Sequence, residues 1–281
     1  MKFTLILTLI IAIYTEPPSN YSLVWSDEFE GNTINSSKWV YDTGGDGWGN
    51  NEYEYYTDRN KNSYVSDGKL HIKAIKEKYK GKKYTSARMK TKGKLEFQYG
   101  YIEANISLPR GTGIWPAFWM LGSDIDEVSW PKCGEIDIIE AINTENKIHS
   151  TCHWYSDGHA QYGINSETFD ITQFHIYYLY WDKEYIRAGV NGQQHYEILI
   201  KDNRGNTGAF HKKFFLILNV AVGGNWPGFD IDDKQFPTEM QVDYIRVYEP
   251  DDDNFILFTF APKDISIPII KYCLFILIFL F

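Results

Sequence analysis

Short segments of alternating or β-branched and aromatic residues recur along the chain, and each is bounded by Gly, Asn or Asp. Segments of this length with turn residues between them are typical of paired strands, and no ten-residue stretch has the period of an amphipathic helix. We therefore predict an all-β sandwich or barrel. The clearest predicted strands are 22–29, 69–75, 100–108, 148–155, 174–181, 185–191, 214–222 and 240–248.

One domain accounts for these strands, because no repeat or low-complexity linker divides residues 20–250. Residues 1–15 begin Met-Lys and continue with an apolar run through Ile13, which is the pattern of a secretory signal peptide. A first buried strand or helix is the alternative for this segment. Residues 265–281 form an apolar tail near the lower length limit for a membrane span, so we expect a C-terminal anchor, either a span or a cleaved lipid-anchor signal. These features predict a secreted or cell-surface protein.

The charge balance argues against nucleic acid as a partner. The formal net charge is −9, whereas phosphate binding needs clustered Lys and Arg. The one basic run, 76–84, is typical of a solvated turn. We expect a monomer.

Three cysteines are too few for a disulfide scaffold. A predicted hairpin turn over 142–147, centred near residue 145, places Cys152 opposite about residue 138 rather than opposite Cys133. We therefore predict that these two cysteines do not form a disulfide.

Aromatic residues make up 17% of the chain, and several lie beside Gly or Asn rather than in apolar runs. Two such segments are DGWGNNEYEYY (46–56) and VGGNWPGF (222–229). Loops of this composition are typical of ligand contacts, because flat rings stack on sugar faces and amides bond hydroxyls. Anchoring of the loops by buried tryptophans is the alternative.

The segment CGEIDIIEAI (133–142) places three carboxylates among isoleucines. Buried carboxylates are costly unless they are paired or protonated, so their presence in a core-like strand indicates chemistry. On a regular strand Glu135 and Asp137 share one face, whereas Glu140 has the opposite parity. One extra residue at 138–139, a β-bulge, would bring all three carboxylates to one face and leave the isoleucines toward the core.

Carboxylates on one face suit glycoside hydrolysis by double displacement. One carboxylate attacks the anomeric carbon, and the other, about 5–5.5 Å away, donates a proton to the leaving oxygen. Asp137, between the two glutamates, can hydrogen-bond the nucleophile and help keep the acid protonated by like-charge repulsion. A solvent-facing acidic strand at a sheet edge is the alternative.

Three more residues are candidates for the same face. By the hairpin count, His153 lies opposite about residue 137, where it can hydrogen-bond Asp137 or a sugar hydroxyl. Trp115 and Trp119 share parity with Ala117 between them, which suits a stacking platform. The alternatives are a structural histidine and two core tryptophans.

Seven segments, in order, resemble glycoside hydrolase family 16, and most closely its laminarinase-type endo-β-1,3-glucanases. The resemblance covers about residues 22–249 and includes the longer E-x-D-x-x-E motif, whereas lichenase-like and xyloglucan-active branches have E-x-D-x-E. The segments are LVWSDEF, GWGNNEYEYYT, YTSARMKTKGK, YGYIEANISLPRGTGIWPAFWMLG, WPKCGEIDIIE, LNVAVGGNWPG and MQVDYIRVYE.

The resemblance implies a jelly-roll β-sandwich of two antiparallel sheets with a substrate cleft across the concave sheet. It implies a retaining endo-glycosidase that hydrolyses internal β-1,3 linkages of laminarin-like β-glucans and needs no cofactor for catalysis. By position, Glu135 would be the nucleophile, Glu140 the general acid/base, and Asp137 an assisting residue between them. The residues implied to contact substrate are Trp115, Trp119, His153, Asn51, Arg88 and Trp226.

The resemblance also implies a structural calcium on the convex side, because members of the family often bind one there. The matching positions are Glu28 and Gly68, through backbone oxygen, and Asp243, through its side chain. Asp243 shares parity with Ile245 and Val247, so its carboxylate is expected to face inward and to need a partner. An aspartate bonded to backbone amides is the alternative.

Two other functions remain open on the same fold. One is a non-catalytic β-glucan-binding recognition protein, a class that lacks the carboxylate pair. The other is a β-glucan transglycosylase, in which a sugar hydroxyl replaces water. The two glutamates disfavour the first alternative, and the motif spacing disfavours the second.

Overall fold

The computed structural model describes residues 17–251, and two β-sheets dominate this part of the chain. The ten-stranded sheet has the order β15-β14-β13-β8-β17-β5-β6-β3, with β1 beside β17 and β4 beside β5. Its strands are β1 (Tyr21–Asp27), β3 (Glu54–Tyr56), β4 (Ser63–Ser66), β5 (Lys69–Tyr79), β6 (Lys82–Ser86), β8 (Gly100–Ser107), β13 (His175–Trp181), β14 (Tyr185–Val190), β15 (Gln193–Leu199) and β17 (Thr238–Pro250).

The seven-stranded sheet has the order β12-β11-β10-β9-β16-β7-β2. Neighbouring strands in both sheets are antiparallel except β3 and β6, which are parallel. The strands of this sheet are β2 (Val40–Asp42), β7 (Arg88–Lys90), β9 (Ile114–Gly122), β10 (Glu135–Glu140), β11 (His149–Tyr155), β12 (His159–Asn165) and β16 (Phe214–Val222).

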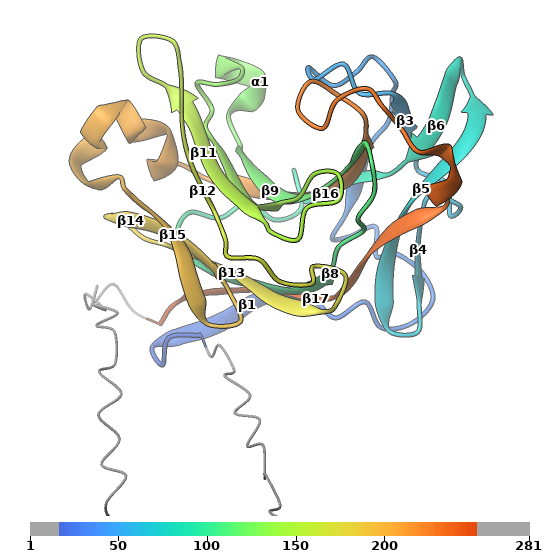
Figure 1. Ribbon diagram of the computed structural model, residues 1–281. Helices are drawn as coiled ribbons and strands as arrows, with labels where there is room; N and C mark the ends of the chain where they lie inside the picture. The colour runs from blue at the N-terminus through green and yellow to red at the C-terminus, as the bar shows by residue number, and fades with distance from the viewer. Residues whose placement is uncertain (1–16, 252–281) are drawn as a thin grey trace, which may run out of the picture. The chain divides into compact units, whose positions relative to one another are not determined.

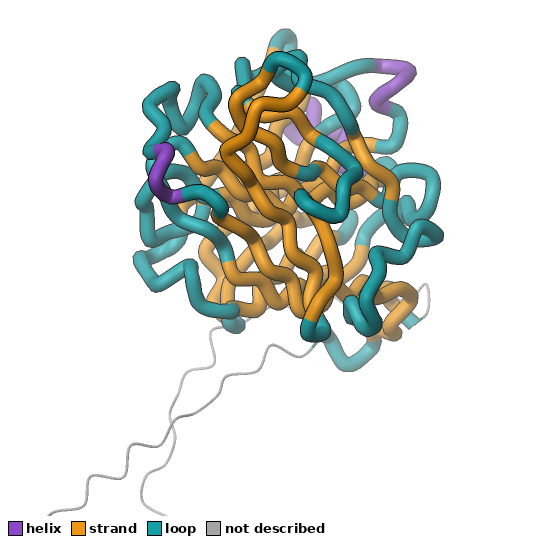
Figure 2. Tube along the Cα trace, turned by 90° about the vertical axis from the view of Figure 1, so that its right-hand side faces the viewer, coloured by secondary structure: helices purple, strands orange, loops and turns teal. Residues whose placement is uncertain are grey.

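The two sheets stack face to face as a jelly-roll sandwich, with β9, β11 and β16 above β8, β13 and β17 in Figure 1. The all-β prediction is confirmed, and each of the eight predicted strands is present within a few residues of its predicted bounds. Figure 2 shows helix only in short peripheral pieces. In the described residues these are α1 (Ile125–Val128) and the 3₁₀ segments Lys201–His211 and Asp233–Gln235.

Alternating side chains from both sheets fill the space between them. On β8, Ile102, Ala104 and Ile106 are fully buried, and they belong to the same apolar cluster as Phe118 and Met120 on β9. Burial of one large apolar side chain contributes about 1.5–3 kcal/mol, so this shared cluster fixes the face that each strand turns outward.

The first and last strands of the described chain are neighbours. Tyr21 pairs with Pro250 and Asp27 with Ile245, and the amide of Asp251 donates to the carbonyl of Asn20 at 2.9 Å. The predicted signal peptide and the predicted C-terminal tail lie outside the described residues.

Candidate active site

An extra residue interrupts β10 at its centre. Asp137 pairs with Trp119 on β9, and the next pair along the ladder joins Ile139 to Phe118, so Ile138 is the additional residue. This arrangement is a β-bulge, and it reverses the alternation of side chains beyond that point. The bulge predicted at 138–139 is confirmed.

The bulge sorts the side chains of β10 and its next residue into two faces. The four aliphatic residues are buried in the core between the sheets, whereas the three carboxylates line a cavity on the opposite face. The core residues are Ile136, Ile138, Ile139 and Ala141, and the cavity residues are Glu135, Asp137 and Glu140. Both isoleucines at the bulge remain buried, so the strand turns Glu140 outward without exposing apolar surface.

The carbonyl group at the bulge is held by a side chain. Ser150 Oγ on β11 donates to the carbonyl of Ile138 at 2.7 Å, and His195 Nε2 on β15 lies 2.9 Å from the same Oγ. The single hydroxyl proton goes to the carbonyl, so His195 must donate to Ser150. Burial lowers the pKa of His195 to about 4, which keeps this ring neutral at pH 7. Both sheets therefore contribute to holding the bulge.

The cavity has a volume of about 320 Å³ and lies on the outer face of the seven-stranded sheet. Four tryptophans share its lining with the three carboxylates, and they are Trp48, Trp115, Trp119 and Trp130. Flat apolar rings beside acidic groups suit a sugar, which has apolar ring faces and a reactive acetal.

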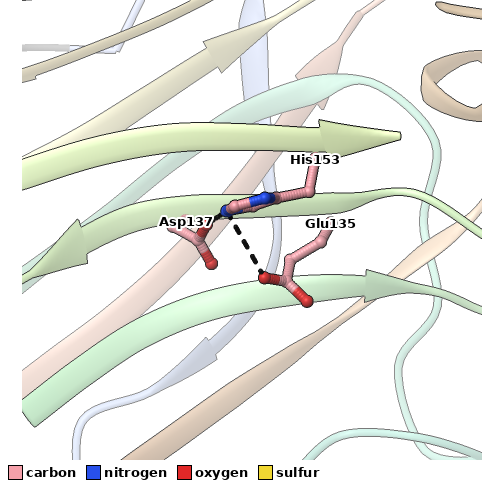
Figure 3. A group of neighbouring side chains, drawn as sticks. All are labelled: Glu135, Asp137 and His153. Carbon is pink, nitrogen blue, oxygen red and sulfur yellow. Dashed lines mark ion pairs between the residues drawn. The ribbon is translucent and has the colours of Figure 1, made fainter. Parts of the chain in front are cut away.

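The two glutamates of β10 have different neighbours. His153 Nε2 lies 3.3 Å from Asp137 Oδ2 and 3.8 Å from Glu135 Oε1, as Figure 3 shows. Glu140 lies at the other end of the strand, where Trp115 Nε1 donates to its Oε1 at 2.9 Å. One glutamate therefore has an imidazole close by, and the other has an indole N–H.

Burial raises the pKa of all three carboxyl groups, that of Glu135 to about 8. The charge of Asp137 raises the pKa of Glu135 further, whereas His153 and Arg88 lower it. The pKa of Glu140 is also raised by the charges of Asp137 and Glu135, and only the bond from Trp115 opposes this. Glu135 therefore ionises more readily, and Glu140 more readily keeps its proton. A nucleophile and a general acid need these respective states.

Trp119 is fixed from two directions. The Arg88 guanidinium lies 4.8 Å from the centre of the Trp119 ring and 5.0 Å from that of Trp48. The Trp119 indole N–H donates to Asn219 Oδ1 at 2.7 Å. Arg88 is itself held by Asp42, whose Oδ2 accepts from its Nε at 3.1 Å. An indole held in this way presents a fixed flat face to the cavity.

A second group of buried carboxyls supports the part of the cavity lining that Trp119 and Asn219 form, and the sequence analysis missed this group. Asn219 Nδ2 donates to Tyr56 Oη at 3.1 Å, and Tyr56 donates to Glu52 Oε2 at 3.0 Å. Glu54 is fully buried beside them, and burial together with the charge of Glu52 raises its pKa well above the usual range. Glu52, Glu54 and Tyr56 share parity, so the alternation that identified Glu135 and Asp137 could also have identified this group.

Three of the six predicted substrate contacts line the cavity, and the other three lie elsewhere. Arg88 and both platform tryptophans line the cavity, and His153 contacts the carboxylates. Trp226 packs edge-on against Trp115, with ring centres 5.4 Å apart, at the edge of the cavity. Asn51 is exposed, and its amide donates to Asn225 Oδ1 at 2.9 Å.

Asn51 does not line the cavity, whereas its neighbours Asn50 and Glu52 do. Asn51 has a φ of 57°, a turn conformation that the sequence analysis did not anticipate. Trp48 lies in the loop 46–56, whose composition predicted ligand contacts, and it lines the cavity. Trp130 and Asn219 were missed; Trp130 is in the loop just before β10, and Asn219 is on β16, far from β10 in sequence.

The predicted hairpin register was wrong by two residues. His153 pairs with Glu135 and Cys152 with Ile136, rather than with residues near 137 and 138. The prediction placed the centre of the turn too late and did not count the extra residue of the bulge. Both buried cysteines, Cys133 and Cys152, are free, as predicted.

The three predicted calcium positions meet beside β17. Strand β5 pairs with β17 as far as Val242, and β1 pairs with β17 from Ile245 onward, so the two strands lie end to end along one edge. Glu28 follows β1 and Gly68 precedes β5, which brings both to the gap beside Asp243. Two backbone carbonyls and a carboxylate are the hard oxygen donors that calcium takes.

The inward orientation predicted for Asp243 was wrong. The pairing of β17 with β8 shifts between Val242 and Tyr244, so the parity of Ile245 does not extend to Asp243. Its side chain is partly exposed, and Oδ2 accepts from Asn105 Nδ2 at 3.0 Å on the outer face of β8. A carboxylate there has solvent and an amide as partners, so burial does not require a metal ion.

Comparison with known proteins gives consistent matches. The model of the family "Glycosyl hydrolases family 16" matches residues 49–246. The Clotting factor G alpha subunit of Tachypleus tridentatus is 47% identical over 82% of this chain, which spans only 34% of that protein. The Beta-glucanase of Rhodothermus marinus is 39% identical over 82% of this chain and 85% of its own length. The X-ray structure of the laminarinase from Rhodothermus marinus has a TM-score of 0.76 and 39% identity over 82% of this chain and 97% of that chain.

Proposed function

The chain belongs to glycosyl hydrolases family 16, and we propose that it is a retaining endo-β-1,3-glucanase that hydrolyses internal linkages of laminarin-like β-glucans. The observation that carries this proposal is the bulge of β10, which brings Glu135 and Glu140 to the lining of one cavity. Similar proteins that are named laminarinase and beta-glucanase support the substrate class.

Hydrolysis proceeds in two displacements at the anomeric carbon. In the first, the Glu135 carboxylate attacks this carbon, the glycosidic C–O bond breaks, and Glu140 gives its proton to the leaving oxygen. In the second, the Glu140 carboxylate takes a proton from water, the water oxygen attacks the same carbon, and Glu135 leaves as a carboxylate. Two inversions retain the anomeric configuration.

The neighbours of each glutamate support these roles. His153 and Arg88 favour the ionised form of Glu135. Trp115 donates to Oε1 of Glu140, so the transferable proton is on Oε2. Asp137 lies between the two glutamates along the strand and raises the pKa of both. Trp115 and Trp119 supply the ring faces on which sugars stack.

The first experiment compares Glu135→Gln with the unmodified chain in release of reducing sugar from laminarin. The change is nearly isosteric, so we expect unchanged folding and no turnover. Glu197→Gln is the matched control, because Glu197 lies on the other sheet, where it pairs with Arg187. A wild-type rate in Glu135→Gln would refute the proposal.

Product analysis in the same assay separates the two alternative functions. Chains longer than the substrate would indicate a transglycosylase, and laminarin binding without any release would indicate a recognition protein. Both glutamates and the bulge that turns them into the cavity are present, which favours the hydrolase.

We also propose a structural calcium ion held by the backbone oxygens of Glu28 and Gly68 and the Asp243 carboxylate. The meeting of these positions beside β17 supports it. The ion would tie β1 and β5 to the last strand and would take no part in catalysis. A chelator should lower the melting temperature of the unmodified chain by a few degrees and leave that of Asp243→Asn unchanged. Equal melting curves with calcium and with chelator would exclude the ion.

We further propose that the protein is a secreted or cell-surface monomer that the C-terminal tail anchors to a membrane. The composition of residues 1–15 and 265–281 supports this proposal. Within residues 17–251, no helix is both long and apolar enough to cross a membrane. Fractionation of expressing cells into medium, membrane and cytosol tests the location, and sedimentation of the purified chain tests the monomer.

A further inference from the structure

We propose that Glu135, Asp137 and His153 form a binding site for one divalent transition-metal ion, with Zn²⁺ as the reference ion, and that occupancy reversibly blocks hydrolysis. The binding half of this proposal stands on the geometry alone. The blocking half rests on the proposed function.

The three side chains offer ligand atoms in one place. One atom from each residue lies within 4.8 Å of the other two, and the two distances to His153 Nε2 are 3.3 and 3.8 Å. Ligands of a tetrahedral zinc ion lie about 3.3 Å apart, given bond lengths of about 2.0–2.1 Å. The imidazole and Asp137 already have this spacing, so only the Glu135 carboxylate needs to move closer.

Asp137 supplies the observation that points to a ligand. Its side chain is 3% exposed, and Oδ2 has no hydrogen-bond partner although it is directed at His153 Nε2. An unpartnered carboxylate oxygen in a buried site is costly, and a cation would remove that cost. Two carboxylates and an imidazole, with room in the cavity for a water molecule, match the open coordination of three-ligand zinc sites.

His159 makes the imidazole of His153 an adaptable ligand. Its Nε2 lies 2.9 Å from His153 Nδ1, and Trp130 packs against it with ring centres 4.6 Å apart. Without a metal, Nδ1 can accept from His159, and Nε2 lies 3.3 Å from Asp137 Oδ2 without forming a hydrogen bond to it. With a metal, Nε2 must present its lone pair, and Nδ1–H can then donate to His159 Nε2. His159 can therefore hydrogen-bond either tautomer of His153. Partners of this kind orient metal-bound histidines.

A metal at this site would compete with the proposed reaction. Coordination would neutralise the negative charge of the Glu135 carboxylate and so weaken it as a nucleophile, and the ion would occupy space beside the cleft residues. Substrate and metal should therefore exclude each other. The Irving–Williams order predicts tighter binding of Cu²⁺ than of Zn²⁺. The hard ions Mg²⁺ and Ca²⁺ should bind weakly, because imidazole is a poor ligand for them.

Direct binding tests the site without any activity measurement. The full-length chain, kept in calcium-containing buffer, is titrated with ZnCl₂ by calorimetry and with CoCl₂ by visible absorption. We expect one Zn²⁺ per chain and the absorption bands of four-coordinate Co²⁺. His153→Asn and the nearly isosteric Asp137→Asn should each weaken binding by more than about 100-fold, and His159→Gln by about 10–100-fold.

His175→Asn is the control, because His175 lies on β13 and bonds Asn191 and Asp170 rather than the cleft residues. Its affinity for Zn²⁺ should equal that of the unmodified chain. Absence of one-site binding, or equal affinity in Asp137→Asn and the unmodified chain, would overturn the proposal. If the metal binds but does not compete with laminarin, the blocking half is wrong. If no glucan is hydrolysed at all, the proposed function fails while the binding result still stands.

Discussion

The two sheets each carry a deeply buried carboxyl group on the outer face, but with different partners. On the ten-stranded sheet, Glu103 is 3% exposed and lies 3.5 Å from Arg246 Nη1. On the seven-stranded sheet, Asp137 is also 3% exposed. Among residues 17–251, no Lys or Arg forms an ion pair with it or with the glutamates of β10. Burial raises the pKa of Glu103 as well, but the charge of Arg246 opposes that rise. Glu103 with its arginine partner helps to hold the fold together, whereas the carboxyls of β10 have raised pKa values and no arginine or lysine ion pair, which suits proton transfer.

The largest effect that the comparison predicts is at the unpaired face. Glu140→Gln removes the general acid, so kcat/KM on laminarin should fall by about 10²–10⁴-fold. An aryl β-glucoside with a good leaving group needs no protonation, so its first step should lose much less. Equal losses on the two substrates would contradict the assigned role.

A smaller effect is expected at the paired face, and it should fall on stability. Arg246→Met removes the ion pairs of Arg246 with Glu103 at 3.5 Å and with Glu28 at 2.8 Å, and it leaves Glu103 only the Tyr248 hydroxyl at 3.3 Å. The change should lower the free energy of unfolding by about 1–3 kcal/mol, since Arg246 is itself partly exposed. The turnover of the folded enzyme should not change. Adding Glu103→Gln should recover part of the loss. A fall in kcat without a fall in melting temperature would break the comparison.

Removing the side chain that holds the bulge should lower the rate by about tenfold. Ser150→Ala leaves the Ile138 carbonyl without its hydroxyl donor, so the bulge can relax and Glu140 can shift. We expect kcat to fall with little change in KM, and Ser150→Thr to restore it because the hydroxyl returns. If Ser150→Ala changes only the melting temperature, Ser150 has a structural role alone.

The smallest predicted effect is a displacement of the pH profile. Glu135 works ionised, so activity rises with pH through its pKa, which is about 8, and falls as Glu140 loses its proton. Asp137→Asn removes a charge that raises both pKa values, so both limbs of the kcat/KM profile should move to lower pH. Arg246→Met should leave the limbs in place. A pH profile that does not move in Asp137→Asn would show that the charge of Asp137 does not affect the pKa values of Glu135 and Glu140.

The sequence was sufficient for the strands and for the bulge. The parity of Glu140 is inconsistent with a regular strand, and this local conflict located the extra residue. Pairing across the hairpin was not predictable to the residue, because every inserted position shifts the count. The orientation of Asp243 failed for the same reason, since a second irregularity breaks the parity of β17. The part of the cavity lining that Trp48 and Asn219 form depends on contacts between distant segments, which a local sequence pattern does not predict.

The pairing of Tyr21 with Pro250 has a practical consequence for engineering. Because these residues are adjacent, a short glycine-rich linker can join them in a circularly permuted gene. New ends can open at the exposed hairpin tip Lys80–Gly81, where the backbone turns outside the cleft lining. Such a permutant would move both chain ends from the β1–β17 edge to this exposed tip, so that a reporter or a second binding module could be fused there.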